Sequence, residues 1–315
     1  MEVKENILLA PFTVFKVGGP ARFFVEAKTA EEVLEAVTWA RGEDMPIFIL
    51  GFGSNILVSD KGFPGLVLKM ELKQISELGA GLPAEARVRA EAGVAMARAV
   101  SFALENGLTG FEWAIGVPGT IGGSVRGNAG CFGQEMEDAV ERIEVLDVEH
   151  SRFDIFQVSA CGFSYRESIF KKRPELIVLS ATLKLEKGDV EEARTRLAEF
   201  TKKRVESQDI GVKTAGSVFK NVPWEGNPPA GGQEGIKFAG SGPKENAAVG
   251  YLLESVGLKG FKIGGAQFSR KHANFLLNTG NATAEDIVQL IAIAKERVFE
   301  TFGVRLEEEI QYVGF

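Results

Sequence analysis

The sequence predicts an α+β protein with two regions that meet near residue 205. Short strand-like runs alternate with helical patterns over the first two hundred residues, and the same alternation resumes near the C-terminus. Between them, residues 223–246 are rich in Pro, Gly and Asn, which indicates a long loop or an insertion. A chain of 315 residues is long enough for two domains with ample cores. We therefore expect a larger N-terminal region, 1–204, and a smaller C-terminal region, 205–315.

Runs of apolar and β-branched residues predict the strands of the larger region. These strands are Arg22–Glu26, Pro46–Leu50, Gly65–Met70, Ala86–Glu91, Ala139–Val148 and Leu176–Leu185. Helical spacing predicts helices over Glu31–Arg41 and Ala95–Glu105, and a polar helix that runs from an Asp189 cap to about Arg204. Thr29 and Glu32 have the spacing of a capping box, and Asn106-Gly107 is a helix stop. We expect the charges of the polar helix to face solvent.

The C-terminal region has its own alternating pattern. Helices are predicted near Ala247–Val256 and from a Thr283 cap to about Phe302, with a strand near Ala273–Leu277. Val304–Val313 is predicted to end the chain as a strand. Within that strand, alternation places Glu307 and Glu309 on one face, so one of them is expected to point inward although a charge run usually faces water.

Composition excludes several function classes. The formal net charge of −7 argues against a general nucleic-acid-binding protein, because no basic surplus exists to neutralise phosphates. The two cysteines, Cys131 and Cys161, have no CxxC spacing and only His150 and His272 accompany them, so neither a disulfide framework nor a metal site is expected. We expect both cysteines to be small buried apolar side chains. The N-terminus lacks a signal-peptide core and no apolar run could span a bilayer, which predicts a cytoplasmic protein without membrane insertion.

The most informative segment is the glycine cluster from Gly116 to Gly130, with six glycines in fifteen residues. Such density argues against an ordinary helix or strand, because each glycine adds backbone entropy that folding must remove. The usual compensation is close approach of bare backbone to a bulky group, often a phosphate held by main-chain N–H groups. The sequence therefore predicts a cofactor cradle, to which we assign Gly116, Pro118, Gly119, Thr120, Gly122, Gly123, Ser124, Asn128 and Gly130.

A second glycine-containing turn, Gly51-Phe52-Gly53-Ser54-Asn55, follows the strand Pro46–Leu50. It is not a dinucleotide-binding GxGxxG, because Ile56 occupies the third glycine position, and the chain contains no GxxxxGK[ST]. Alone, this pentapeptide is more often a plain turn. Together with the cluster some sixty residues later, it predicts two loops that close on one pyrophosphate, with Gly51, Phe52, Gly53, Ser54 and Asn55 assigned to cofactor binding.

Three polar side chains are candidates for catalysis or substrate binding, and each is weakly supported when taken alone. Arg166 has the planar fork that binds a carboxylate, although a surface ion pair is the common alternative. Ser217 has no GxSxG context for a hydrolase nucleophile, so a strand-edge hydroxyl is its plain interpretation. His272 opens an apolar strand, where a histidine is more often a satisfied core residue than a catalyst.

Taken together, nine segments resemble the UDP-N-acetylenolpyruvoylglucosamine reductase family, and they occur in the order that the family uses. They are Thr13–Pro20, Gly51–Asn55, Gly116–Gly123, Asn128–Gly130, Tyr165–Ser168, Ala215–Asn221, Gly264–Ala266, Lys271–Asn274 and Leu306–Ile310. From the first to the last, they span nearly the whole chain. Any one segment is weak evidence, whereas nine colinear matches are specific.

The resemblance implies a two-lobed FAD-binding region of the vanillyl-alcohol-oxidase-like type, with lobes of approximately 1–80 and 81–204. It also implies a substrate-binding domain over 205–315, whose last strand contributes to the active site. FAD would be bound non-covalently, NADPH would be the co-substrate, and the flavin would reduce UDP-N-acetylglucosamine enolpyruvate to UDP-N-acetylmuramate for peptidoglycan synthesis. A flavin takes hydride at one time and gives it at another, so both substrates can use one site in turn.

The resemblance also gives the scattered polar residues roles. Arg166 matches the residue that stabilises the enolate, Ser217 the donor of a proton to the α-carbon, and Glu309 the glutamate that hydrogen-bonds the substrate carboxyl. Lys220 is a candidate for activating the Ser217 hydroxyl. The expected substrate-binding residues are Tyr165, Asn221 and His272.

Departures from the family pattern are Phe52 between the turn glycines, Gly127 before Asn128, Glu308 in place of a proline, and the length of 223–246. Two other functions stay open on the same residues. One is a flavin oxidase or dehydrogenase of a hydroxy acid or sugar lactone, which would lack the Ser217 and Leu306–Ile310 segments in this arrangement. The other is a non-catalytic protein that binds a nucleotide sugar, and it predicts a colourless purified protein.

Overall fold

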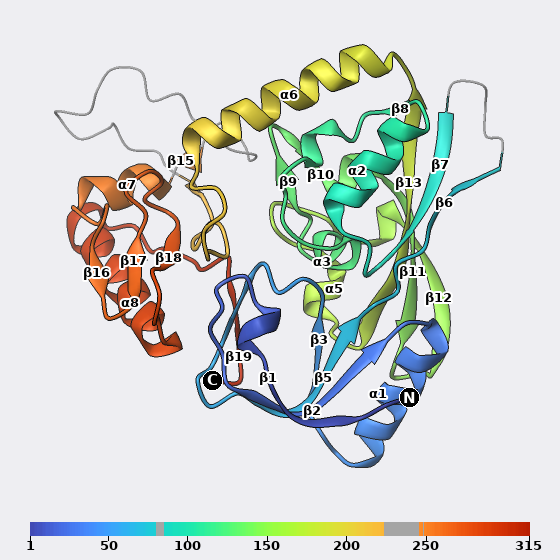
Figure 1. Ribbon diagram of the computed structural model, residues 1–315, viewed down its shortest axis with the longest axis horizontal. Helices are drawn as coiled ribbons and strands as arrows, with labels where there is room; N and C mark the ends of the chain where they lie inside the picture. The colour runs from blue at the N-terminus through green and yellow to red at the C-terminus, as the bar shows by residue number, and fades with distance from the viewer. Residues whose placement is uncertain (80–84, 224–245, 248) are drawn as a thin grey trace.

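The computed structural model describes residues 1–79, 85–223, 246–247 and 249–315, and it confirms the α+β class (Figure 1). Three sheets of three or more strands form its framework, with the helices packed on their faces and ends. The loop predicted over 223–246 lies almost wholly outside the described residues.

The first sheet has the order β1-β2-β5-β3, in which β1 is antiparallel to β2 and the other pairs are parallel. Its strands are β1 (Lys4–Leu8), β2 (Pro20–Ala27), β5 (Phe63–Met70) and β3 (Ile47–Leu50). Helix α1 (Ala30–Gly42) buries Val33, Ala36, Val37 and Ala40 against this sheet. Thr29 caps the helix through Glu32 N, as predicted, but the Glu32 carboxylate accepts from Lys28 N instead of Thr29 N.

The second sheet is wholly antiparallel, with the order β12-β11-β13-β7-β6 and β8 paired to the end of β13. Its strands are β12 (Arg152–Gln157), β11 (Val140–Asp147), β13 (Leu176–Lys187), β7 (Glu85–Glu91), β6 (Ile75–Leu78) and β8 (Leu108–Thr109). Helices α2 (Met96–Glu105) and α6 (Val190–Ser207) lie beside it, and one continuous apolar core joins this lobe to the first. Asp189 caps α6 as predicted, and Asn106 ends α2.

A separate core forms around the C-terminal helices α7 (Val249–Ser255) and α8 (Ala284–Phe302) and the sheet β16-β17-β18. Its strands are β16 (Lys262–Ile263), β17 (Ala266–Phe268) and β18 (Leu276–Asn278). Thr283 begins α8 with a capping box, as predicted. The Asp60 carboxylate, from the first lobe, accepts from the free N–H groups of Ala284 and Glu285 and so ties α8 to that lobe. This core supports the predicted boundary near residue 205, which stays a prediction.

The chain end corrects the longest predicted strand. Within Val304–Val313, only β19 (Gln311–Val313) forms a ladder, in parallel with β4 (Ile56–Val58) of the first lobe. Residues 304–310 make a single bridge, Phe219 to Glu308, because they cross between the two cores and have no continuous neighbouring strand. Similarly, the strand predicted at Ala273–Leu277 is shifted to Leu276–Asn278.

The remaining elements are short, and several of them pack against the second sheet and its helices. They are η1 (Ala10–Phe12), η2 (Glu112–Ala114), η3 (Val158–Ala160), α3 (Ile121–Arg126), α4 (Met136–Ala139), α5 (Ile169–Lys172), β9 (Gly130–Cys131), β10 (Gln134–Glu135), β14 (Val222–Pro223) and β15 (Asn246–Ala247).

Candidate active site

A cavity of about 1440 Å³ lies between the two glycine-containing loops, the C-terminal domain and one end of α6. Cavities for drug-sized ligands occupy about 300–1,000 Å³. The cavity therefore has room for a dinucleotide together with part of a second ligand. Twelve of the fourteen residues predicted to contact the cofactor line it, as do all six predicted catalytic and substrate-binding residues.

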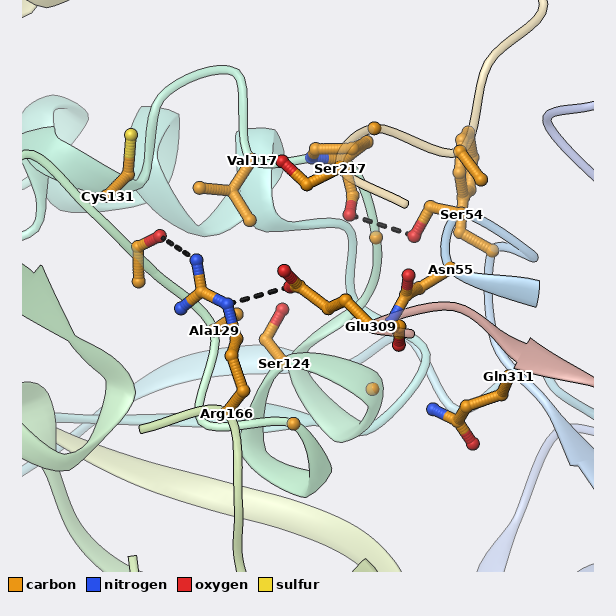
Figure 2. Close-up of a pocket in the computed structure, with 18 of the residues that line it drawn as sticks. Ser54, Asn55, Val117, Ser124, Ala129, Cys131, Arg166, Ser217, Glu309 and Gln311 are labelled. Atoms are coloured by element: carbon orange, nitrogen blue, oxygen red, sulfur yellow. Dashed lines mark hydrogen bonds and ion pairs between the residues drawn. The ribbon is translucent and has the colours of Figure 1, made fainter. Parts of the chain in front are cut away.

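The two glycine-containing loops meet on one wall of this cavity. The hydroxyl of Ser54 donates to the carbonyl of Pro118 at 2.9 Å, which joins the turn after β3 to the loop before α3 (Figure 2). A Cβ at Gly51 would lie 2.7 Å from Thr120 Oγ1. The loops are therefore in van der Waals contact, and any larger residue at position 51 would separate them.

The same wall has the bare backbone that a dinucleotide needs. Gly119 has φ of +139°, a conformation that side chains rarely adopt, and a Cβ there would lie 3.1 Å from Ser54 Oγ. A Cβ at Gly122 would lie 2.8 Å from the Cβ of Ala92, so α3 packs directly against the chain after β7. Phe52, 57% exposed, stands at the edge of the cavity. These residues fit FAD, since a phosphate-bearing ligand could approach the main chain without meeting side chains.

Three expectations about the glycine cluster need correction. The cluster contains a short helix, α3, because Thr120 caps it through Gly123 N and Gly122 allows the close approach to Ala92. Gly116 does not line the cavity, since Arg204 packs over it. Asn128 is fully buried away from the cavity, and both hydrogens of its amide are used, one by Glu135 at 2.7 Å and one by the carbonyl of Ser164 at 3.0 Å.

Arg166 and Glu309 meet at the cavity wall beside both glycine-containing loops, since the side chain of Asn55 donates to the carbonyl of Glu309 at 3.0 Å. Nε of Arg166 donates to Oε1 of Glu309 at 2.7 Å, and Nη2 donates to the carbonyl of Gly130 at 3.1 Å (Figure 2). Burial opposes the charge of Arg166, but Glu309, Tyr165 and Glu135 outweigh it and raise the pKa of the guanidinium. Arg166 therefore remains a cation at any working pH, held in one plane by two partners.

Ser217 joins this pair from a third segment. Two isolated bridges hold its neighbourhood, one from Ser217 to Phe275 and one from Phe219 to Glu308. The carbonyl of Val218 accepts from the Glu309 amide at 2.7 Å, which places residues 217 and 309 on adjoining backbones. Figure 2 shows the side chains of Ser217, Glu309 and Arg166 around one space.

The predicted substrate-binding residues lie on the side of the cavity near the C-terminal domain. The Tyr165 hydroxyl accepts from the backbone N–H of Asn221 at 3.2 Å. The side-chain oxygen of Asn221, Oδ1, accepts from the backbone N–H of Val249 at 3.3 Å. Burial raises the pKa of the Tyr165 phenol and lowers the pKa of His272. At neutral pH, a substrate therefore meets a neutral phenol and a neutral imidazole.

Sequence reasoning missed one wall of the cavity. The helix α6 was expected to have a solvated polar face, but Phe200, Lys203 and Arg204 line the cavity from its last turns. Arg204 Nη2 lies 2.9 Å from the sulfur of Cys131, which also lines the cavity and is only half-buried, contrary to expectation. An aromatic residue such as Phe200 in an otherwise polar helix was the available signal.

A second missed residue is Arg126, at the end of α3. It lines the cavity, and its Nη1 donates to the Gln311 side chain at 2.6 Å. Burial lowers the pKa of this guanidinium. Its position inside the glycine cluster offered no signal, because its partner lies in β19, at the other end of the chain.

Two further findings concern metal sites and membrane spans. Among the described residues, no group of three or more His, Cys, Asp or Glu side chains could hold a metal ion. No helix in the described part of the chain is both long and apolar enough to cross a membrane.

Comparisons with known proteins connect this geometry to a family. An FAD-binding-domain family model matches residues 21–151, and a model of the UDP-N-acetylenolpyruvoylglucosamine reductase C-terminal domain matches residues 203–313. The chain is 40% identical over 302 residues to the UDP-N-acetylenolpyruvoylglucosamine reductase of Caldanaerobacter subterraneus, covering 96% of this chain and 90% of the relative. It is 38% identical over 314 residues to the enzyme of the same name from Syntrophomonas wolfei, and the match covers 99% of this chain and 95% of the relative.

A solved structure gives the same result for the fold. The UDP-N-acetylenolpyruvylglucosamine reductase of Thermus caldophilus superposes with a TM-score of 0.77 at 32% identity, and the match covers 99% of both chains. The resemblance inferred from nine short segments is confirmed, and so are the FAD-binding region and the FAD cofactor.

Proposed function

Because this chain belongs to the UDP-N-acetylenolpyruvoylglucosamine reductase family, we propose that it reduces UDP-N-acetylglucosamine enolpyruvate to UDP-N-acetylmuramate with NADPH, in the cytoplasm. The observation that carries the proposal is the convergence of Arg166, Ser217 and Glu309 on one cavity, beside the glycine-containing wall that fits FAD. Residues 1–204 would hold the cofactor and 205–315 the nucleotide sugar, with Glu309 supplied by the terminal segment.

FAD supplies the exchange of hydride between the two substrates when it is bound. The protein must then handle the negative charge that grows on the substrate carboxylate as the adjacent double bond is reduced. Arg166 has a guanidinium whose orientation is fixed before substrate arrives, by Glu309 on Nε and by the carbonyl of Gly130 on Nη2. Such preorganised cations stabilise developing charge without reorganising during the reaction.

The second requirement is a proton for the α-carbon. Ser217 is the hydroxyl on the same cavity wall as Glu309, and the bridge to Phe275 and the neighbouring hydrogen bond from Glu309 N fix its backbone. We assign it the donor role. Glu309 has two functions in this proposal, since one carboxylate oxygen orients Arg166 and its backbone aligns the Ser217 segment. Lys220 was a candidate for activating Ser217, but it does not line the cavity.

Substrate selection is assigned to the C-terminal side of the cavity. Tyr165 and Asn221 hydrogen-bond each other, so the turn that carries Arg166 is tied to the wall that would hold the nucleotide. His272 stands on the same wall with an imidazole that burial keeps neutral. Neutral donors and acceptors suit the uracil and sugar hydroxyls of a nucleotide sugar.

The test is an anaerobic titration of the purified holoprotein. The proposal predicts a yellow protein that bleaches with NADPH and regains its colour when UDP-N-acetylglucosamine enolpyruvate is added, with a product two mass units heavier than the substrate. A protein that is reduced by a hydroxy acid and ignores the enolpyruvyl sugar is an oxidase of the same fold. A colourless protein that binds the sugar without FAD is a non-catalytic binding protein.

A further inference from the structure

The three side chains assigned to catalysis come from segments that no continuous sheet joins. Arg166 lies in the turn between Ser164 and Glu167, Ser217 follows a glycine turn, and Glu309 lies in the crossing segment before β19. Each segment makes only isolated bridges. Backbone hydrogen bonds join the Ser217 segment to the Glu309 segment, so it is the Arg166 turn whose position relative to them depends on side-chain contacts.

Lys220 makes contacts with all three segments. Its ammonium group lies 2.8 Å from Oε1 of Glu167, next to Arg166, and 2.6 Å from Oε1 of Glu307, two residues before Glu309. Its backbone N–H donates to the carbonyl of Glu307 at 2.9 Å. The lysine itself is three residues after Ser217. One cation therefore neighbours every segment that carries a catalytic group.

The Arg166 turn needs such an anchor because its backbone is strained. Arg166 has φ of +57°, in the left-handed region, which costs a non-glycine residue roughly 1–2 kcal/mol. Ser164 and Glu167 close the turn with two backbone hydrogen bonds of 3.1 and 3.0 Å. Beyond these, the Glu167 carboxylate is held by Lys220, and Lys171 donates to the carbonyl of Arg166. A strained turn persists only where surrounding contacts determine it.

The surroundings of Lys220 exclude a direct role in the reaction. Neither Lys220, Glu167 nor Glu307 lines the cavity. The Lys220 side chain is 13% exposed, and two carboxylates occupy its ammonium group. Burial opposes its charge, but hydrogen bonds to Glu167 and Glu307 outweigh burial and raise the pKa of the ammonium. It is therefore a fixed cation and a poor proton donor at neutral pH.

We propose that Lys220 is a positioning residue for the substrate-reduction step, which fixes Arg166 relative to Ser217 and Glu309 through its ion pairs with Glu167 and Glu307. The ion pair with Glu167 accounts for most of this positioning. Glu307 has a side chain that is 70% exposed, and such pairs contribute little, whereas Glu167 is 29% exposed and belongs to the strained turn itself. This inference rests on the proposed function for its kinetic consequence, but its structural consequence is independent of any substrate.

The test compares Lys220→Met with Lys295→Met in the FAD-loaded protein. Lys295 is the matched control, because it pairs with Glu308 of the same terminal segment at 2.8 Å but, within the described part of the chain, has no hydrogen bond or ion pair to the Arg166 turn. In Lys220→Met, the rate of re-oxidation by the enolpyruvyl sugar should fall roughly ten- to a hundredfold, as expected for a misplaced catalytic group. Reduction by NADPH should stay within about twofold of wild type, and Lys295→Met should match wild type in both steps.

Three further variants distinguish positioning from a general loss of stability. Glu167→Gln should reproduce the kinetic defect and Glu307→Gln should not, while Lys220→Arg should restore much of the rate. Glu167→Gln also weakens the 3.6 Å pair with Lys171, and Lys220→Met also removes the exposed pair with Glu307, but both changes remove the Lys220–Glu167 contact. The double variant Lys220→Met/Glu167→Gln should therefore be much less impaired than the product of the two single defects. A double variant in which the two defects multiply would overturn the proposal, as would full activity in Lys220→Met.

A substrate-free measurement separates this inference from the proposed function. Hydrogen exchange of the backbone amides of residues 164–167 should quicken in Lys220→Met and not in Lys295→Met. If the wild-type protein ignored the enolpyruvyl sugar, the proposed function would fail while this result could still support the anchor. Unchanged exchange in the turn, or equal quickening in both variants, would overturn the anchor whatever the substrate.

Discussion

Nε of Arg166 donates to Oε1 of Glu309 at 2.7 Å, although 143 residues separate them in sequence. The same Glu309 accepts through its backbone carbonyl from the side chain of Asn55 at 3.0 Å. A residue of the cofactor-side turn, the catalytic arginine and the terminal segment are thus joined through one glutamate. This arrangement places the chemistry beside the cofactor wall, and each part of it can be tested separately.

The guanidinium of Arg166 should not be replaceable by an ammonium. In Arg166→Lys, one point charge cannot contact Glu309 and the Gly130 carbonyl in the geometry of the fork. We expect the rate of substrate reduction to fall by roughly 10²–10³-fold, with NADPH oxidation by the enzyme-bound cofactor preserved, in single-turnover experiments. Arg152→Lys, at an exposed arginine of β12, is the control. Near-normal turnover in Arg166→Lys would remove Arg166 from the mechanism.

The contact between the two glycine loops should control FAD affinity. In Gly51→Ala the new methyl group would lie 2.7 Å from Thr120 Oγ1, so the loops must move apart. Fluorescence titration of the apoprotein with FAD should show a dissociation constant raised by about tenfold, equivalent to about 1.4 kcal/mol. Gly42→Ala is the control, since a methyl group there meets nothing within 4 Å. Equal dissociation constants in both variants would contradict the assignment of this wall to FAD.

The stability of the protein should depend on pH through an ion pair on the second sheet, between Arg89 of β7 and Glu144 of β11. Arg89 donates to both oxygens of Glu144, with a shortest distance of 2.7 Å, and this hydrogen bonding lowers the pKa of the Glu144 carboxyl. A lowered pKa means that the stabilisation is present above the unfolded-state pKa, about 4.3, and is lost as pH falls through the lower folded-state pKa.

Glu144→Gln should accordingly lower the free energy of unfolding by about 1 kcal/mol at pH 7, and by much less near pH 3. Urea unfolding of the holoprotein at both pH values measures this difference. Glu149→Gln, at an exposed position, should change little at either pH. A deficit in Glu144→Gln that stayed constant down to pH 3 would show that the ion pair is not its source.

Local signals predicted the helices and caps but not the contacts between distant segments. The caps at Thr29, Asp189 and Thr283 are present because each depends on residues within a few positions of the helix start. The ladder of the last strand was overestimated, because apolar alternation cannot show whether a neighbouring strand exists.

The same limit explains the errors in the candidate site. The family motifs gave Arg166, Ser217 and Glu309 by position, but nothing in the sequence indicated the ion pair between the first and the last. Asn128 is predicted to contact the cofactor because it lies within the glycine cluster, yet its amide is used inside the fold by Glu135 and Ser164. Arg204 was read as part of a solvated face, because helical periodicity does not show what a partly polar face will meet.

The central claim is that Ser217, facing Arg166 and Glu309, acts only after the cofactor has been reduced. The most direct measurement is rapid mixing of NADPH-reduced Ser217→Ala holoprotein with UDP-N-acetylglucosamine enolpyruvate under anaerobic conditions. Ser207→Ala is the control, because it removes the hydroxyl of another serine that lines the cavity. We expect re-oxidation of Ser217→Ala to slow by roughly 10²–10⁴-fold, while its reduction by NADPH and both steps in Ser207→Ala stay close to wild type. Re-oxidation of Ser217→Ala at the wild-type rate would contradict the account.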